Sequence, residues 1–496
     1  MAELVFFPTG LQTPELEIML SKAQISIDNG NKVIVATCSG GRGYACSLNI
    51  YGVPLICYTC RSQTRRGLSL LKGKFTHITT PSIEQFSVDV CSKEQILESR
   101  YTLKNYRFND VDVGQAAYSS YIGLSRDLDL EGYLSRYSLK KLLSTSETLA
   151  KWSEIIFESR NISKVFLYNG RQNQYRPVLR VAQNNKIPVE VMEFAGQSAS
   201  CVYDFQNQLP QDIDTLVSKI EFCWESFCGD KLRSASEFFI SKRSGGAVND
   251  QKSYVREQRE GMIPKGWDSS RRNIVIFNSS EDEFSALGGE YDKTLYASQV
   301  NAISLLLESL KDETDIIFWL RMHPNLKGVS WSFASKLKHL GSKYKNINVI
   351  LPESPISTYS LLDMCDVAIS FGSTMGVEAA YWGKPSILLG RCAYERYHSV
   401  YVPTSHSEAV SLICNRELPS LDKEGAYKVG LFWSKGGKSL LNFSGNRKDG
   451  FKFLDHYIQK SFYGKLSFGI GKFFEKFILG RLINDRFLLT GYSREK

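Results

Sequence analysis

The chain has 496 residues, of which 43% are hydrophobic and 23% are charged, and its formal net charge is +9. The hydrophobic fraction argues against extensive disorder, and the length favours two domains over one. The positive charge is spread along the chain without a nucleic-acid-binding module, so we expect no nucleic-acid partner, while an anionic substrate or membrane surface is compatible with it.

The first ten residues, "MAELVFFPTG", lack the basic region, apolar core and small-residue cleavage site of a signal peptide. No apolar run approaches the roughly 18 residues of a membrane-spanning helix. We therefore expect a cytoplasmic protein, in which the 11 cysteines are mostly reduced.

Strand-like and helix-like segments alternate in the first third of the chain. Residues 4–10 and 32–38 predict strands, because both are rich in β-branched or aromatic residues and lead into turns. Residues 13–30 predict a helix with Thr13 at its cap and Gly30 at its end. Strand, helix and strand in this order indicate a parallel α/β unit.

Four cysteines of this region lie close together in the sequence: Cys38, Cys46, Cys57 and Cys60. Four thiolates at such spacing could close a tetrahedral zinc site. However, Cys38 ends a predicted strand and there is one C-x2-C pair rather than two. We therefore prefer buried, reduced thiols and keep a zinc site as the alternative.

The domain boundary is predicted from a change in composition. Strands predicted at 164–171 and 187–196 are followed by a basic, polar stretch, within which we place the boundary near residue 265. The predicted organisation is a first domain at 1–265, a second domain at 266–430 and C-terminal helices at 431–496.

The second half alternates in the same way. Strands are predicted within 274–284, 315–324, 347–353, 366–373 and 384–390, and helices at 299–311, 357–365 and 374–383. The simplest assembly is two doubly wound α/β domains that face each other across a cleft. Ligands of such sheets bind outside the carboxyl ends of the strands.

A turn of small and polar residues joins one of these strands to its helix. Gly372 and Gly376 allow close approach of the backbone, while the Ser373 and Thr374 hydroxyls can donate hydrogen bonds. The free N–H groups and positive dipole end of the helix make phosphate the natural ligand here. Glu378, one turn on, could accept hydrogen bonds from a ribose, or it could be a solvated helix carboxylate.

The segment "CDVAISFGSTMGVEAAYWGKPSILLG", with "RMHPN" upstream, resembles the nucleotide-sugar-binding half of GT-B glycosyltransferases, particularly bacterial enzymes of capsule and O-antigen synthesis. The segment "LYNGRQNQYRPVLRVAQNNKIPVEVMEFAG" resembles part of their acceptor half. The resemblance implies a donor site built from Ser279, Ser280, Arg321, His323, Gly372, Ser373, Thr374, Met375 and Glu378. The alternatives for Arg321 and His323 are an ordinary ion pair and a buried loop residue.

Catalytic candidates follow from the same resemblance. Inverting transfer needs a general base in the first domain, and Glu193 at the end of its strand is the first choice. Asp282 is the second, although three consecutive acids are also typical of a helix N-terminus. Asn169, Arg171 and Arg176 belong to the acceptor side, with a surface ion pair as the alternative for the arginines.

We expect transfer without a metal or cofactor, because there is no Asp-x-Asp pair at a strand end and GT-B enzymes generally need none. The C-terminal tail places Ile470, Phe473, Phe474, Phe477, Ile478 and Leu482 on one helical face, with basic residues near its edges. This pattern predicts either a peripheral contact with an anionic membrane or a helix docked on the domains.

The sequence thus predicts a cytoplasmic, membrane-associated glycosyltransferase. Its expected partners are a nucleotide-sugar donor and a lipid-linked bacterial surface glycan as acceptor. The alternatives are a CDP-polyol phosphotransferase of the teichoic-acid type, a sugar-nucleotide epimerase and a non-catalytic GT-B scaffold.

Overall fold

The computed structural model describes residues 1–40, 44–81, 91–130, 133–195, 201–245, 257–329 and 332–474. The chain forms two compact units. The first is Met1–Asp212 together with the chain from Lys438 onward, and the second is Ile213–Gly437. Each unit is described separately below.

The first unit is built on a sheet of seven strands, in the order β12-β6-β5-β4-β1-β2-β3. These are β1 (Ala2–Phe6), β2 (Val33–Thr37), β3 (Thr76–Thr79), β4 (Ile162–Tyr168), β5 (Val189–Phe194), β6 (Cys201–Gln206) and β12 (Lys438–Ser439). The strands β1 to β5 are parallel, whereas β6 and β12 run antiparallel to their neighbours. The order reverses between β1 and β4, which creates a crevice at their carboxyl ends.

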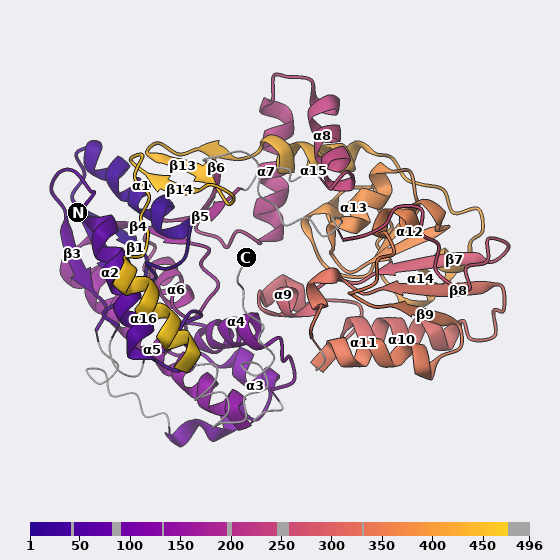
Figure 1. Ribbon diagram of the computed structural model, residues 1–496, viewed down its shortest axis with the longest axis horizontal. Helices are drawn as coiled ribbons and strands as arrows, with labels where there is room; N and C mark the ends of the chain where they lie inside the picture. Colours follow the sequence, from indigo (N-terminus) through magenta and orange to yellow (C-terminus); the bar gives the residue numbers. More distant parts are fainter. Residues whose placement is uncertain are drawn as a thin grey trace. The chain divides into compact units, whose positions relative to one another are not determined.

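Helices cover both faces of this sheet (Figure 1). They are α1 (Glu15–Asp28), α2 (Pro54–Leu68), α3 (Arg100–Asn105), α4 (Val113–Ser125), α5 (Tyr133–Arg160), α6 (Arg176–Asn184) and α16 (Phe462–Phe473), with a short helix at Cys91–Leu97. Alternate side chains of β1 serve the two faces. Val5 lies in a core with Met19 of α1, whereas the ring of Phe6 lies 5.7 Å from that of Trp152 in α5. A hairpin of β13 (Phe443–Asn446) and β14 (Gly450–Phe453) closes the α1 side.

The second unit has a fully parallel sheet of five strands, in the order β11-β10-β7-β8-β9. These are β7 (Arg272–Phe277), β8 (Ile316–Arg321), β9 (Ile347–Ile350), β10 (Val367–Ser370) and β11 (Ser386–Leu388). The order again reverses beside the first strand, here between β7 and β10. Helices α10 (Gln299–Ser309) and α11 (Ser332–Lys343) cover one face, and α12 (Thr358–Met364) and α13 (Thr374–Tyr381) cover the other (Figure 1).

The remaining helices of this unit are α7 (Ile213–Ser226), α8 (Lys231–Arg243), α9 (Glu281–Ser285), α14 (His406–Cys414) and α15 (Glu424–Lys435), with short 3-10 turns at Gly289–Asp292, Pro324–Leu326 and Ala393–Arg396. The α7–α8 pair packs on α15. The ring of Phe239 in α8 stacks on Tyr381 at 4.1 Å, and a Cβ at Gly430 in α15 would lie 2.5 Å from Phe239.

This packing moves the boundary between the units. We predicted the boundary near residue 265, but the division falls after Asp212, because α7 and α8 pack on helices of the second unit. Residues after α8 also belong there, since the Arg259 N–H donates to the Pro355 carbonyl at 2.7 Å. The predicted C-terminal segment is divided as well: α15 belongs to the second unit, and the chain from Lys438 returns to the first.

The predicted fold class is confirmed: both units are Rossmann-like α/β structures with the same order of five parallel strands. The strands predicted in both halves correspond to β1, β2, β4, β5 and β7 to β11. The cleft between two facing domains stays a prediction. Within the described residues, no helix combines the length and apolar character needed to cross a bilayer.

Candidate functional site

The turn between β10 and α13 has the geometry predicted for it. Gly372 has a φ of +91°, and a Cβ there would lie 2.9 Å from the Arg391 carbonyl oxygen, so the position requires glycine. Ser373 caps α13, because its Oγ accepts a hydrogen bond from the Met375 N–H at 3.3 Å. The residues from Gly372 to Met375 are partly exposed. A helix N-terminus is therefore accessible at the carboxyl end of β10, beside the reversal of strand order.

Gly376 serves the fold rather than a ligand. A Cβ there would lie 2.4 Å from the Tyr394 hydroxyl oxygen. Tyr394 uses this space to donate a hydrogen bond to the Ser373 carbonyl at 2.6 Å. The expected close approach of a ligand at Gly376 is thus wrong, and the glycine instead lets a buried tyrosine fix the turn.

A lysine that the sequence analysis missed lies at this turn. Lys242 of α8 donates a hydrogen bond to Thr374 Oγ1 at 3.0 Å, and its Nζ lies 3.5 Å from Glu378 Oε1. The side chain is 25% exposed. Its position adds a cation to a helix end that already favours anions. The basic stretch containing Lys242 was visible in the sequence, but nothing there placed it beside a turn so distant along the chain.

Glu378 is held by partners inside the second unit. It is 1% exposed, and its Oε2 accepts a hydrogen bond from the Tyr359 hydroxyl. Burial raises the pKa of Tyr359, and the nearby Glu378 carboxylate raises it further, so Tyr359 remains a protonated donor. The predicted contact between Glu378 and a ribose would therefore require the carboxylate to leave both Tyr359 and Lys242.

Arg321 also differs from its predicted role. The side chain is 2% exposed, and its guanidinium donates to the Leu351 carbonyl at 2.6 Å and the Ser354 carbonyl at 3.4 Å. Burial lowers the pKa of Arg321 to about 10, which leaves it charged at neutral pH. Arg321 thus fixes the loop after β9 through these two hydrogen bonds.

The serines and histidine after β7 and β8 form a hydrogen-bonded cluster. Ser279 Oγ donates to the Phe371 carbonyl at 3.1 Å and accepts from Gln299 Nε2 at 2.9 Å, so it joins the ends of β7 and β10 instead of facing a ligand. His323 Nδ1 accepts from the Asn325 N–H at 3.1 Å, which places the proton of the neutral ring on Nε2. Ser280 Oγ accepts from Asn325 Nδ2 at 3.3 Å.

Asp282 lies in α9, whose first turn carries three acids. Its side chain is 2% exposed. A general base must reach a proton of the substrate. Because Asp282 is buried in this structure, its position does not support the predicted catalytic role and fits the alternative of a helix N-terminus.

In the first unit, the structure brings Glu193 and Asn169 together. Glu193 Oε2 accepts a hydrogen bond from Asn169 Nδ2 at 2.6 Å. Asn169 follows the last residue of β4, and Glu193 is the last but one residue of the neighbouring parallel strand β5. Burial raises the pKa of Glu193, while the Asn169 hydrogen bond and the charges of Arg171 and Arg447 oppose this rise. Glu193 is therefore a partly buried carboxyl group whose pKa is raised above its ordinary value.

Arg176 does not join this group. It is 4% exposed, and its Nε donates to Asp112 Oδ2 of α4 at 2.8 Å. The predicted role in holding an anionic acceptor is therefore wrong, because the guanidinium is committed to a buried ion pair. The alternative of an ion pair is correct, except that the pair is buried.

A second carboxyl group, Glu15, lies near Glu193 and was missed in the sequence. It is 1% exposed and accepts hydrogen bonds from the Tyr175 hydroxyl and from Thr9 Oγ1 at 2.8 Å. Burial raises the pKa of Glu15 to about 8, and the charges of Glu193 and Glu17 add to this rise. Acids are common in the first turn of a helix, so the sequence carried no signal of this burial.

The four clustered cysteines are free and each is partly buried. Among the described residues, no group of three or more His, Cys, Asp or Glu side chains is placed to hold a metal ion. The four cysteines form no disulfide among the described residues, as the interpretation of reduced thiols expects, and the choice between reduced thiols and a zinc site stays a prediction.

Comparison with known proteins adds distant similarities. Residues 326–419 match a family described as "Protein of unknown function (DUF354)", and no curated protein matches the chain. Among solved structures, the chain is similar to a Thermosulfurimonas dismutans KpsC described as a beta Kdo 2,4 transferase, at 13% identity and a TM-score of 0.34, over 54% of this chain and 79% of that chain.

Two further similarities extend over more of the chain. A Neisseria meningitidis UDP-GlcNAc 2-epimerase bound to UDP-GlcNAc is 13% identical, with a TM-score of 0.30, over 88% of this chain and 98% of that chain. The Streptomyces nogalater glycosyltransferase SnogD is 12% identical, with a TM-score of 0.24, over 88% and 94%. Because these identities and TM-scores are low, the proposals below rest on the chain's own residues.

Proposed function

We propose that this protein is a metal-independent glycosyltransferase of the GT-B type, which moves a sugar from a nucleotide-sugar to a bacterial surface glycan. One observation carries the proposal: the exposed turn at the N-terminus of α13 has the Lys242 ammonium 3.0 Å from Thr374 Oγ1. This places a cation, a helix dipole and backbone N–H groups at the carboxyl edge of a Rossmann-like sheet.

A nucleoside diphosphate fits this combination. When the glycosidic bond to the donor breaks, negative charge grows on the departing phosphate, and fixed donors and cations stabilise that charge. Lys242 and the helix N-terminus supply both without a metal ion. The buried Glu378 carboxylate pairs with Lys242 and so holds its Nζ near Thr374. We assign Glu378 this positioning role.

Glu193 is the proposed general base. Its carboxylate takes the proton of the acceptor hydroxyl while that oxygen attacks the anomeric carbon and the bond to the nucleotide phosphate breaks. The Asn169 amide orients the carboxylate through its hydrogen bond. A carboxyl group with a raised pKa accepts a proton more readily than an exposed one.

We also propose a peripheral contact with an anionic membrane through α16. Its outward face carries Phe462, Leu466, Ile470 and Phe473, each at least half exposed. Lys465 and Lys472 flank this face. An apolar face with basic neighbours is typical of a helix that lies in a membrane interface. The predicted tail residues Phe477, Ile478 and Leu482 lie outside the described residues.

The test is a thermal-shift panel with UDP, GDP, CMP, CDP and ADP. Stabilisation by one nucleotide identifies the donor class, and stabilisation by CDP alone favours the polyol phosphotransferase. Lys242→Met should lose the shift, whereas Lys231→Met, on the same helix, should keep it. If no nucleotide stabilises the protein at millimolar concentration, the proposal is wrong.

A further inference from the structure

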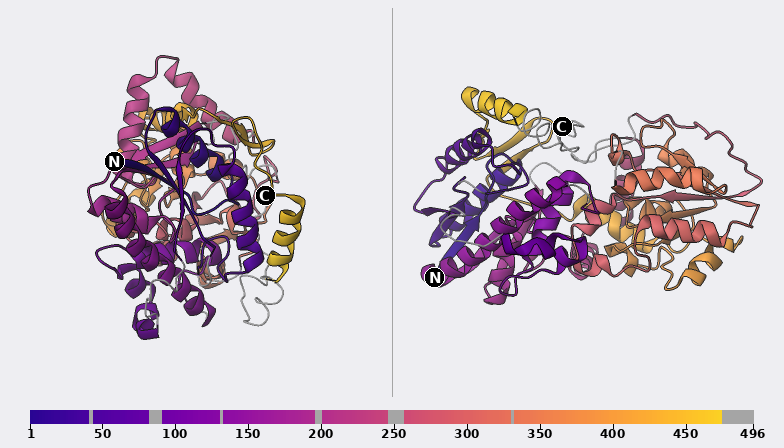
Figure 2. Two further views of the ribbon diagram at one scale, coloured as in Figure 1. Left: turned by 90° about the vertical axis from the view of Figure 1, so that its left-hand side faces the viewer. Right: turned by 90° about the horizontal axis from the view of Figure 1, so that it is seen from below.

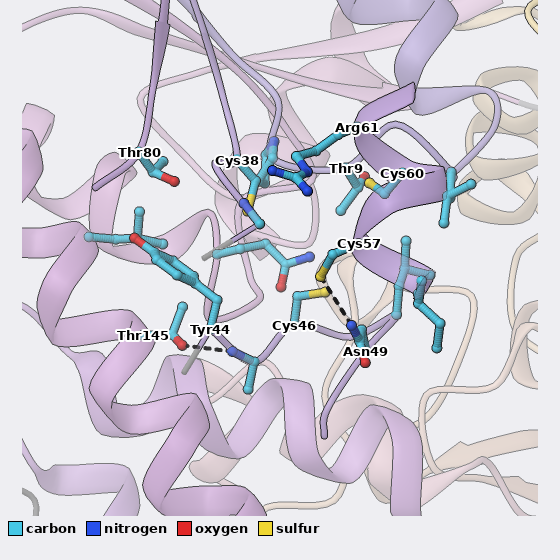
Figure 3. A pocket seen from close by; sticks show the side chains of 18 residues that line it. Thr9, Cys38, Tyr44, Cys46, Asn49, Cys57, Cys60, Arg61, Thr80 and Thr145 are labelled. Carbon is cyan, nitrogen blue, oxygen red and sulfur yellow. Dashed lines mark hydrogen bonds between the residues drawn. The ribbon is translucent and has the colours of Figure 1, made fainter. Parts of the chain in front are cut away.

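The first unit contains a pocket at the carboxyl ends of β1, β2 and β3 (Figure 3). Its walls come from the segments that follow these strands and from α2 and α5. Its empty volume of about 610 Å³ includes the open mouth of the pocket. All the residues that line the pocket belong to the first unit.

The accessible wall of the pocket is almost entirely apolar. Four thiols contribute to it, those of Cys38, Cys46, Cys57 and Cys60, and Figure 3 shows them around the space. Burial raises the pKa of every one, that of Cys60 to about 12, so they are neutral at physiological pH. Neutral thiols behave as small, polarisable apolar groups, and they react slowly because only a small fraction is thiolate.

Several polar side chains also line the pocket, although they expose little polar surface in it, and Arg61 and Gln174 are two of them. Arg61 donates from Nη1 to the Ser39 carbonyl at 3.0 Å, but its buried Nε has no hydrogen-bond partner within the described residues. Gln174 is 2% exposed, and its buried Oε1 has no partner there either. A buried polar group without a partner costs free energy that a complementary ligand recovers. The guanidinium is a permanent cation, so the complementary ligand group is an anion.

We propose that this pocket binds an amphiphile, whose apolar chain or ring lies against the thiols and whose anionic group contacts Arg61. Two wall residues connect the pocket to α16. Lys472 Nζ donates to the Leu48 carbonyl at 3.0 Å, and Gly471 of α16 packs closely on Ile56. The pocket therefore adjoins the helix that exposes the apolar face described above. The proposal depends on neither the nucleotide site nor glycosyl transfer.

The first test uses cis-parinaric acid, a fluorescent fatty acid, and its uncharged methyl ester. Fluorescence titration of the full chain should show saturable binding of the acid and about tenfold weaker binding of the ester, because the ester loses a charge-assisted contact. Arg61→Gln should weaken binding of the acid to the level of the ester and leave the ester unchanged. Competition by the aromatic anion 1-anilinonaphthalene-8-sulfonate would show that the pocket also admits a ring. Absence of competition would show that the apolar part of the ligand is a chain. Either result agrees with binding of an anionic amphiphile.

Two further measurements locate the binding. Cys46→Phe should fill the pocket and abolish binding of the acid, whereas Cys228→Phe, at an exposed cysteine of the second unit, should not. If Cys46→Phe fails to fold, labelling of the unchanged protein with N-ethylmaleimide replaces it. Saturating acid should then slow the labelling of Cys57 several-fold and leave that of Cys228 and Cys414 unchanged. Equal binding of acid and ester, or unchanged labelling of Cys57, would overturn the proposal.

Discussion

Lys242 and Glu378 form an ion pair that accounts for the burial of the carboxylate and for the position of the ammonium group. Glu378 is buried, and its carboxylate has a cation within reach only because α8 brings Lys242 to it. Lys242 in turn reaches the first residue of α13. We predict that Lys242→Met weakens binding of the stabilising nucleotide at least tenfold, as expected for one charge-assisted contact to phosphate. Isothermal titration measures this, with Lys231→Met as the control; an unchanged affinity would contradict the assignment.

Glu193 should control turnover rather than nucleotide binding. Glu193→Gln keeps an acceptor for Asn169 but cannot take a proton, so nucleotide release from the donor sugar should slow by about 10²–10⁴-fold. The nucleotide affinity should stay within error of the unchanged protein. Because burial raises the pKa of Glu193, activity should fall as the pH drops through a value above the usual 4.5. A variant with normal turnover would remove Glu193 from the mechanism.

Glu15 predicts how stability depends on pH. Its pKa is about 8 in the fold against 4.5 ordinarily, so between these values the folded state holds a proton that the unfolded state has released. The contribution of Glu15 to stability is therefore greatest below pH 4.5, and it is lost as the pH rises toward 8, by about 1.4 kcal/mol per pH unit. Glu15→Gln should remove this contribution from the slope, as measured by denaturant unfolding at pH 5 to 8. Glu158→Gln, an exposed site in α5, should keep the slope; equal slopes in the two variants would contradict the prediction.

At single residues, the sequence predicted what depends on local chain geometry. The turn at Gly372 and the cap at Ser373 follow from residues adjacent in sequence, and both are present. The partners of Arg321 and Arg176 were not predictable, because they come from a loop and a helix elsewhere in the chain. Residue type indicated that both arginines would be charged. Only the packing of the folded chain decides whether a guanidinium contacts a ligand, a carbonyl or a carboxylate.

At the scale of elements, α16 combines the two alternatives predicted for the C-terminal tail, a docked helix and a helix with an exposed apolar face. Glycine weakens an isolated helix. In this structure α16 lies along α2 (Figure 2). Gly464 and Gly471 lie on the face that packs on α2, and Thr59 Oγ1 of α2 donates to the Gly464 carbonyl at 3.2 Å. The glycines therefore allow close packing of the two helices. The helix is docked on the first unit and still presents its opposite, apolar face to solvent.

That outward face predicts a preference for anionic lipid. The full chain should sediment with phosphatidylglycerol vesicles and much less with phosphatidylcholine vesicles, since the lysines of α16 add an electrostatic contribution. The double variant Leu466→Ser/Ile470→Ser should reduce the bound fraction several-fold. Leu305→Ser, at an exposed leucine of α10, is the matched control. Equal sedimentation of both variants would show that α16 makes no membrane contact.

At the scale of the whole molecule, alternation of strands and helices was sufficient to predict two Rossmann-like sheets, because the parallel strands of each sheet come from consecutive segments. The limits of the units were not predictable in this way. A polar stretch after α8 resembles a linker, yet α7 and α8 precede it and pack on α15, far along the chain. The contact of Phe239 with Tyr381 and Gly430 decides the boundary, and no local composition encodes it.

The two boundaries make different predictions for fragments of the chain. A fragment of residues 213–437 contains the whole second unit, including Lys242, and we expect it to fold cooperatively and to bind the stabilising nucleotide within about threefold of the full chain. A fragment of residues 266–430 lacks α8, which exposes the packing surface of Phe239 on α13 and α15 and removes the cation from the turn. It should melt without a cooperative transition and bind at least tenfold more weakly. Circular dichroism melts and isothermal titration compare the two, and equal behaviour of the fragments would show that α8 contributes neither to the stability of the second unit nor to its phosphate site.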